Sequence, residues 1–342
     1  MKHLLFKAIA VILSMALFLL CTEVVLRIFG PDHWSLPNIS KEYYTNPRGY
    51  HGLLREEEGR AVYGLIANMS VEGYRLPDDG STKTADISGT DNMILGLGDS
   101  FTFGRGVKYD DLYLAILRKT LNEGGYNCEI HNCARIGANV ADVFSIYKHV
   151  SSHTKYKLVI YGFVPNDFIP AGADEIIGHD FIDFDNRSFR LSYFRERSKL
   201  YDFISSLIEK KRLTSVTRLR YLDAYKDSGA EDGFRIIKQL NRDIKESGGR
   251  LSIVLFPLLH DFKKYYFIDI NEKMKSFCEN EGIEILDLLP AFSQYSAEDL
   301  WVNPADHHPN EIANKIASEE IYRFMKASGL LDTLSRYSGT TE

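Results

Sequence analysis

Short apolar runs alternate with amphipathic stretches from about residue 92 to residue 326, a pattern typical of strands alternating with helices. The predicted strands cover 92–98, 127–133, 157–163, 250–256 and 283–287. The predicted helices cover 110–123, 139–152, 231–247, 270–281 and 310–326, with a further helical segment near 199–211. Parallel strands joined by helices need right-handed crossovers, which place helices on both faces of the sheet. We therefore expect an α/β fold, a three-layer α/β/α sandwich around a parallel sheet of about five strands.

The N-terminus carries the longest apolar segment, a charge-free run over 8–20 that follows Lys2 and Lys7 and continues past Glu23. A cleaved signal peptide would need small residues before its cleavage site, and a lipoprotein signal would need one before Cys21, where a leucine stands. The apolar residues run all round the helix, which argues against an amphipathic helix of the main domain. We expect a transmembrane signal anchor in the cell membrane, spanning it once. Because the positive charge precedes the span, the rest of the chain should lie on the extracytoplasmic side.

The chain is thus expected to have four parts. They are a signal anchor over 1–30, a stalk and irregular lead-in over 31–90, a main domain over 91–330 and a C-terminal tail over 331–342. Within the domain, residues 167–230 should form an insertion that frames the pocket. The aromatic residues of this insertion either pack the loop or stack on sugars, and packing is favoured.

The composition and short motifs exclude several classes of function. A formal net charge of −6 over 342 residues, without a long Lys/Arg run, excludes a nucleic-acid binder. The four cysteines include no Cys-x-x-Cys pair, so no zinc site is expected. Gly96 and Gly98 begin a dinucleotide-like pattern, but Phe101 replaces its third glycine. We expect no metal and no cofactor.

The candidate chemistry lies where strands end, since ligands of such sheets bind at the carboxyl ends of the strands. Ser100 follows the first strand, Gly137 the second and Asn166 the third, and Asp306 and His308 precede the last helix. Each alone has a plain structural reading, as a turn, a helix cap or a surface histidine. Their joint order carries the argument.

This order resembles the SGNH (GDSL-type) hydrolase family over about residues 70 to 328. The block Gly98-Asp99-Ser100-Phe101-Thr102-Phe103-Gly104 is close to the family's first block, and Gly137, Asn166 and Asp306-x-His308-Pro309-Asn310 follow in family order. The N-terminal span, Gly73-Tyr74-Arg75 and Ser198-Lys199-Leu200-Tyr201 resemble membrane-anchored bacterial members. The resemblance implies a flavodoxin-like fold and a catalytic triad of Ser100, His308 and Asp306. It also implies an oxyanion hole formed by the backbone N–H groups of Ser100 and Gly137 and the side-chain amide of Asn166.

The residue types suit that chemistry. A serine hydroxyl needs a base to take its proton, and a carboxylate holds the imidazole in one tautomer. Many family members place the aspartate three residues before the histidine, where this chain has Ala305, although the spacing of two also occurs. His307 also adjoins Asp306 and is the alternative base; we favour His308 because Pro309 and Asn310 follow it, as in the family motif.

The expected function is hydrolysis of O-acyl esters, O-acetyl esters above all, on carbohydrate such as cell-surface polysaccharide. Three alternatives stay open: an O-acetyltransferase with the same triad, a lipase or lysophospholipase, and a non-catalytic scaffold of the envelope. The expected partners are therefore an acylated carbohydrate or lipid-like ester and the membrane.

Overall fold

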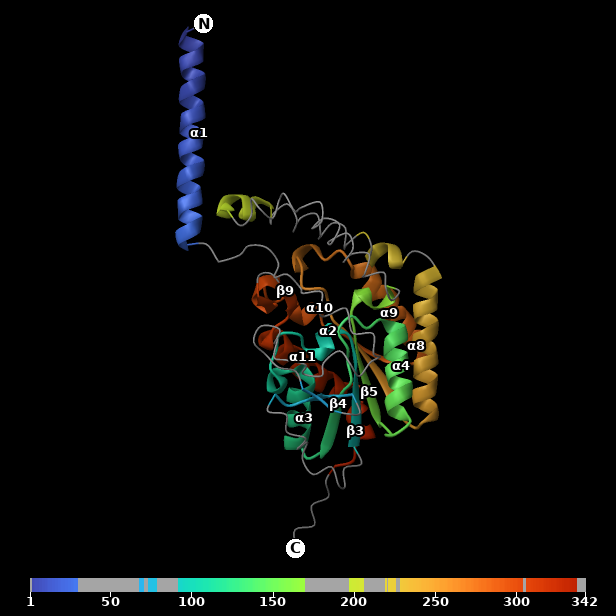
Figure 1. Ribbon diagram of the computed structural model, residues 1–342. Coiled ribbons are helices and arrows are strands. Elements are labelled where there is room, and N and C mark those ends of the chain that lie inside the picture. Colours follow the sequence, from blue (N-terminus) through green and yellow to red (C-terminus); the bar gives the residue numbers. More distant parts are fainter. Residues whose placement is uncertain are drawn as a thin grey trace. The chain divides into compact units, whose positions relative to one another are not determined.

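The structure is a computed structural model, which describes residues 2–29, 68–70, 73–78, 92–169, 197–205, 219, 221–225, 228–303 and 306–336 (Figure 1). Contacts between Cα atoms divide the chain into two units. Residues 2–29, 197–205 and 219 belong to the first unit, and the other described residues belong to the second.

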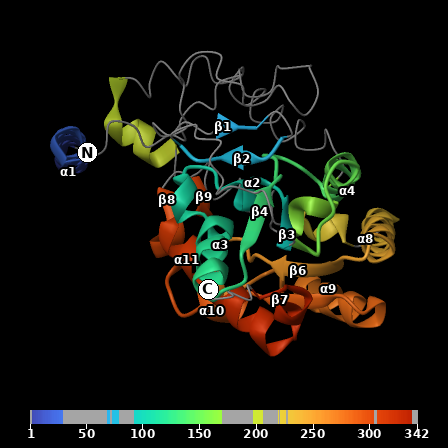
Figure 2. The ribbon, with the colours of Figure 1, turned by 90° about the horizontal axis from the view of Figure 1, so that it is seen from below.

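A five-stranded parallel sheet forms the centre of the second unit. Its strands are β3 (Asn92–Gly98), β4 (Cys128–Asn132), β5 (Leu158–Phe163), β6 (Arg250–Leu255) and β7 (Glu284–Asp287). They lie in the order β4-β3-β5-β6-β7 (Figure 2). The residues of β3, β4 and β5 are nearly all buried, as expected for strands covered on both faces. The predicted α/β fold is confirmed, and each strand begins and ends within one residue of its expected position.

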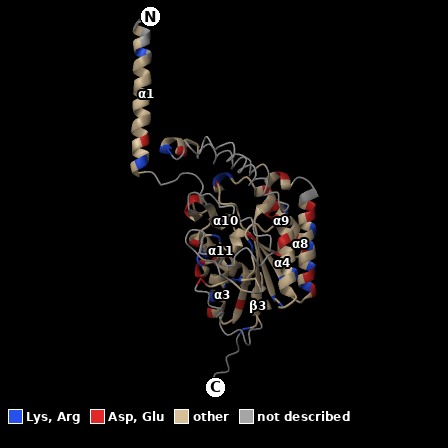
Figure 3. Ribbon diagram, in the orientation of Figure 1, with Lys and Arg blue, Asp and Glu red and all other residues tan. Residues whose placement is uncertain are grey.

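Helices cover both faces of this sheet. On one face α3 (Tyr113–Glu123) contacts α11 (Glu311–Ala327), and on the other α4 (Val140–Ser151) contacts α8 (Ser228–Glu246) (Figure 2). The remaining helices of this unit include α9 (Ile268–Glu281), which leads into β7, and the short α10 (Leu289–Phe292). Charged residues lie along the helices, whereas the strands carry few (Figure 3). This distribution leaves the apolar faces of the helices for the core.

The strand order fixes where a ligand can bind. β3 pairs with β4 on one side and β5 on the other, so the chain reverses its direction of travel across the sheet at β3. In open α/β sheets the ligand crevice lies outside the strand ends at this switch point. Gly98, the last residue of β3, pairs with Gly162 near the end of β5. The segments that follow these two strands therefore meet at the expected crevice.

Several short elements were not predicted. The short helix α2 (Ser100–Phe103) follows β3 directly. A small hairpin joins β1 (Asn68–Met69) to β2 (Arg75–Leu76), and a second joins β8 (Trp301–Asn303) to β9 (Asp306–Pro309). Short 3-10 helices also lie at Tyr109–Asp111, Pro165–Phe168, Phe262–Lys264, Ala297–Leu300 and Leu330–Thr333.

The C-terminal tail expected over 331–342 is described as far as residue 336. Leu331 and Leu334 are buried in the hydrophobic core, and the backbone N–H of Ser335 donates to Asn92 Oδ1 over 2.9 Å. Residues 331–336 thus pack on the edge of the sheet domain. Most of the expected insertion over 167–230 and most of the expected lead-in over 31–90 lie outside the described residues.

The first unit contains α1 (Lys2–Phe29), a single helix of 28 residues. Its stretch Ile9–Phe29 has a mean hydropathy of 2.6 and is long and apolar enough to cross a membrane. The charged residues lie near its two ends (Figure 3). A helix of this length and composition is compatible with a membrane anchor and with a signal sequence alike.

Candidate active site

Ser100 lies at the first position of α2, immediately beyond the end of β3. Asp99 caps the helix, because its Oδ1 accepts a hydrogen bond from the backbone N–H of Phe101 over 2.8 Å. This strand-to-helix turn places the serine side chain at the carboxyl edge of the sheet. The first N–H groups of a helix lack partners within the helix, so the Ser100 N–H is suited to bind an anionic oxygen.

His308 meets Ser100 from the last part of the domain. Its Nε2 lies 2.8 Å from Ser100 Oγ. The ring is carried by β9 and packs against the Phe101 ring, with centroids 5.4 Å apart and planes 61° apart. A neutral imidazole at this distance can accept the serine proton, which is the contact a nucleophile and its base require.

His307 lies elsewhere. Its ring stacks on Trp301 of β8, with centroids 3.8 Å apart and planes 13° apart. Successive side chains of a strand point to opposite sides, so the strand that aims His308 at Ser100 turns His307 away from it. Trp301 is itself held by a hydrogen bond of 2.7 Å from its Nε1 to the backbone oxygen of Leu259. Of the two candidate bases, the structure places His308 beside the serine.

Asp306 shares β9 with His308, and its backbone pairs with that of Asn303 in β8. Its side chain lies outside the described residues. The carboxylate–imidazole pair expected from the sequence therefore stays a prediction.

The other two candidates lie on loops at the same edge of the sheet. Gly137 adopts a positive φ of 75° in the turn after β4, a conformation that favours glycine. This turn is tied to the end of β3, because the N–H of Arg135 donates to the oxygen of Gly98 over 3.1 Å. Asn166 lies in the 3-10 helix after β5, and its Nδ2 donates to Asp99 Oδ2 over 3.4 Å. Asp99 thus links the asparagine to the serine's own turn.

Asp99 is the carboxylate beneath this site. It is 1% exposed, and burial raises its pKa from 3.8 to about 6. The hydrogen bond from Phe101, the charge of His308 and the amide of Asn166 act in the opposite direction and favour the carboxylate. Asp167 lies deeper: burial and then the charge of Asp99 hold its pKa well above the usual range, and Tyr161 donates to its Oδ2 over 2.8 Å.

Thr102 of α2 packs at the ends of β4 and β5, a contact that was not predicted. The hydroxyl of Tyr113 donates to Thr102 Oγ1 over 3.1 Å, and Asn132 Nδ2 donates to the Thr102 oxygen over 2.8 Å. Gly162 leaves room for this contact, since a Cβ there would stand 2.1 Å from Thr102 Oγ1. The serine's helix is thereby held against β4, β5 and α3.

Arg75 is the second missed residue. Its buried guanidinium donates to three backbone oxygens at and after the C-terminal end of α2, those of Phe103, Gly104 and Val107, over 2.6, 3.0 and 2.8 Å. Burial lowers its pKa to about 10, which leaves it charged at neutral pH. The sequence pattern around Gly73-Tyr74-Arg75 does not indicate which backbone groups the arginine contacts.

The sequence matches no protein-family model and no curated protein. The structure is similar to several solved structures at low sequence identity. TesA shares 13% identity, covering 69% of this chain and 99% of that one, with a TM-score of 0.46. A lipolytic protein of the G-D-S-L family from Veillonella parvula shares 12%, covering 68% and 96%, with a TM-score of 0.42. The acetyl xylan esterase AlAXEase shares 12%, covering 68% and 98%, with a TM-score of 0.43.

These similarities concern the fold alone. The roles of individual residues rest on the geometry described above.

Proposed function

We propose that this chain is a serine esterase that hydrolyses O-acyl esters. Ser100 is the nucleophile, His308 is the base and Asp306 orients the imidazole. The observation that carries the proposal is the 2.8 Å contact between Ser100 Oγ and His308 Nε2 at the switch point of the sheet. The same reading explains why a glycine turn and an asparagine follow the two neighbouring strands.

The reaction has two halves. His308 accepts the proton of Ser100 as Oγ attacks the ester carbonyl, and then gives that proton to the departing alcohol, which leaves an acyl-serine. Water, activated by the same imidazole, releases the acid and restores the hydroxyl. In each half the carbonyl oxygen becomes an anion, for which we propose the N–H groups of Ser100 and Gly137 and the side-chain amide of Asn166 as donors.

We further propose that α1 is a retained membrane anchor and that the catalytic domain faces the extracytoplasmic side. The length and hydropathy of Ile9–Phe29 support a span. Lys2 and Lys7 before it support an N-terminus that stays inside. Surface polymers are accessible to such an enzyme, and an O-acetyl group on cell-surface polysaccharide is the substrate class that we infer.

A panel of esters tests this function. The full chain in detergent would be assayed with sugar and aryl esters of increasing acyl length, beside Ser100→Ala. Ser145→Ala, an exposed serine of α4, is the matched control. We expect the wild type and the control to cleave acetyl esters fastest, and Ser100→Ala to be inactive.

Other outcomes would identify another activity. A preference for long acyl chains would indicate a lipase. Transfer to an added sugar in place of release would indicate a transferase. Equal rates for Ser100→Ala and wild type would refute the proposal.

A further inference from the structure

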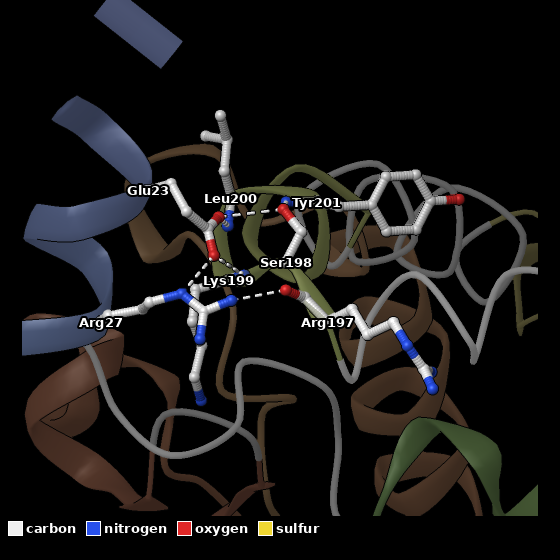
Figure 4. Close-up of polar contacts among 7 residues, drawn as sticks. All are labelled: Glu23, Arg27, Arg197, Ser198, Lys199, Leu200 and Tyr201. Carbon is white, nitrogen blue, oxygen red and sulfur yellow. Dashed lines mark hydrogen bonds and ion pairs between the residues drawn. The ribbon is translucent and has the colours of Figure 1, made fainter. Parts of the chain in front are cut away.

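Glu23 is the one acidic residue in the apolar stretch Ile9–Phe29. A carboxylate within or at the edge of a membrane span is costly, and such residues as a rule face a partner. The partners of Glu23 come from a segment far away in the sequence (Figure 4). This contact lies wholly within the first unit of the chain.

The two carboxylate oxygens of Glu23 together accept three hydrogen bonds, one from each of the consecutive residues Ser198, Lys199 and Leu200. Oε2 accepts from the Ser198 hydroxyl over 2.9 Å and from the Leu200 N–H over 2.8 Å. Oε1 accepts from the Lys199 N–H over 3.0 Å. The carboxylate is therefore surrounded by donors that belong to one short stretch of backbone.

These donors are the ones that a helix start leaves unpaired. Residues 199–205 are helical, and the first N–H groups of a helix have no partner within it. Ser198 satisfies one of them itself, because its Oγ accepts from the Tyr201 N–H over 3.1 Å. Glu23 accepts from the two preceding N–H groups, those of Lys199 and Leu200. Its negative charge also lies at the positive end of the helix dipole. A side chain from α1 thus completes the cap of another helix.

Arg27 extends the contact by one residue. It lies one turn beyond Glu23 on α1, and its Nε donates to Glu23 Oε1 over 2.7 Å. The same guanidinium donates to the backbone oxygen of Arg197. Glutamate before arginine at this spacing is the favourable order on a helix. The two side chains together hold the backbone from residue 197 to residue 200.

We propose that the C-terminal end of α1 is a docking surface for residues 197–201 of the same chain, with Glu23 as its acceptor and Arg27 as its donor. On this account α1 is a folded part of the mature protein. Removing it would leave the N–H groups of Lys199 and Leu200 without their acceptor. The inference rests on the proposed retention of the anchor and is independent of the esterase chemistry.

Hydrogen exchange tests the docking directly. The full chain in detergent micelles would be followed by mass spectrometry over peptides that cover 198–203. In the wild type these amides should exchange slowly. In Glu23→Ala they should exchange at least about tenfold faster, since two hydrogen bonds to a charged acceptor are lost. The substitution makes the span more apolar, so insertion into the micelle is preserved.

Three controls distinguish loss of the Glu23 contact from other causes of faster exchange over 198–203. Thr22→Ala removes a neighbouring side chain whose hydrogen bond stays within α1, to the oxygen of Phe18, and should leave exchange at wild-type rates. Ser100→Ala should also leave it unchanged, so an error in the catalytic assignment would not affect the result. Peptides from β5 should exchange alike in all variants and report on the fold of the second unit.

Unchanged exchange over 198–203 in Glu23→Ala would overturn the proposal. So would a mature N-terminus beyond residue 23, measured by the intact mass of the protein purified from membranes. Faster exchange in Glu23→Ala, together with a retained N-terminus, would establish the docking.

Discussion

Asp99 offers the sharpest test of the electrostatics beneath Ser100. Its pKa is raised from 3.8 to about 6 by burial, so the folded chain holds this proton more tightly than the unfolded chain does. The free energy of unfolding therefore falls as the pH rises from about 3.8 to about 6, and it does not recover at higher pH. The full shift corresponds to about 3 kcal/mol of unfolding free energy.

The replacement Asp99→Asn removes the titration and keeps the size of the side chain. Between pH 5 and pH 8 the wild type should lose about 1.4 kcal/mol of stability relative to the variant. Any cost that does not depend on pH, such as a poorer cap for α2, cancels in this comparison. Activity should fall in the variant at every pH, because Asp99 accepts from both Phe101 and Asn166.

Urea unfolding of both proteins, followed by circular dichroism in detergent at several pH values, measures the difference. A difference that does not change with pH would show that Asp99 does not titrate in this range. A difference of the opposite sign would show that the site stabilises the carboxylate more than burial penalises it. Either result would refute the reasoning about burial.

Three further predictions concern residues around the serine. His308→Ala should reduce kcat by several orders of magnitude in an ester assay, whereas His307→Ala, which loses the stack on Trp301 and the contact with the His260 ring, should stay within about tenfold of wild type; the reverse ranking would reassign the base. Asn166→Ala should cost about 10²–10³ in kcat, the usual effect of one oxyanion donor, and a loss confined to KM would contradict that role. Gly162→Ala should lower the unfolding free energy by about 1–3 kcal/mol, because its Cβ would stand 2.1 Å from Thr102 Oγ1, and an unchanged melting temperature would contradict the packing described here.

The sheet could be predicted from the sequence because its strands are apolar runs bounded by turns. Buried parallel strands such as β3 and β5 have no polar face, so their boundaries are sharp in the pattern. Once the strands are assigned, Ser100, Gly137 and Asn166 are each seen to follow the end of one strand. That placement follows from topology and needs no knowledge of side-chain contacts.

The supports of the site could not be predicted in this way. The hairpin of β8 and β9 is too short to show an alternation of polar and apolar residues in the sequence. It nevertheless directs His308 toward Ser100 and His307 toward Trp301. Arg75 reaches the loop beyond α2 through tertiary contacts that no local pattern records. Glu23 looked like an interruption of the span, and only the contact with residues 198–200 gives it a role.

Covalent labelling tests the central assignment most directly. The full chain would be treated with a fluorophosphonate, and the modified residue would be located by peptide mass spectrometry. The account predicts one adduct, on Ser100, that forms far more slowly in His308→Ala and at the wild-type rate in His307→Ala. A labelled residue other than Ser100, or labelling at an undiminished rate in His308→Ala, would contradict it.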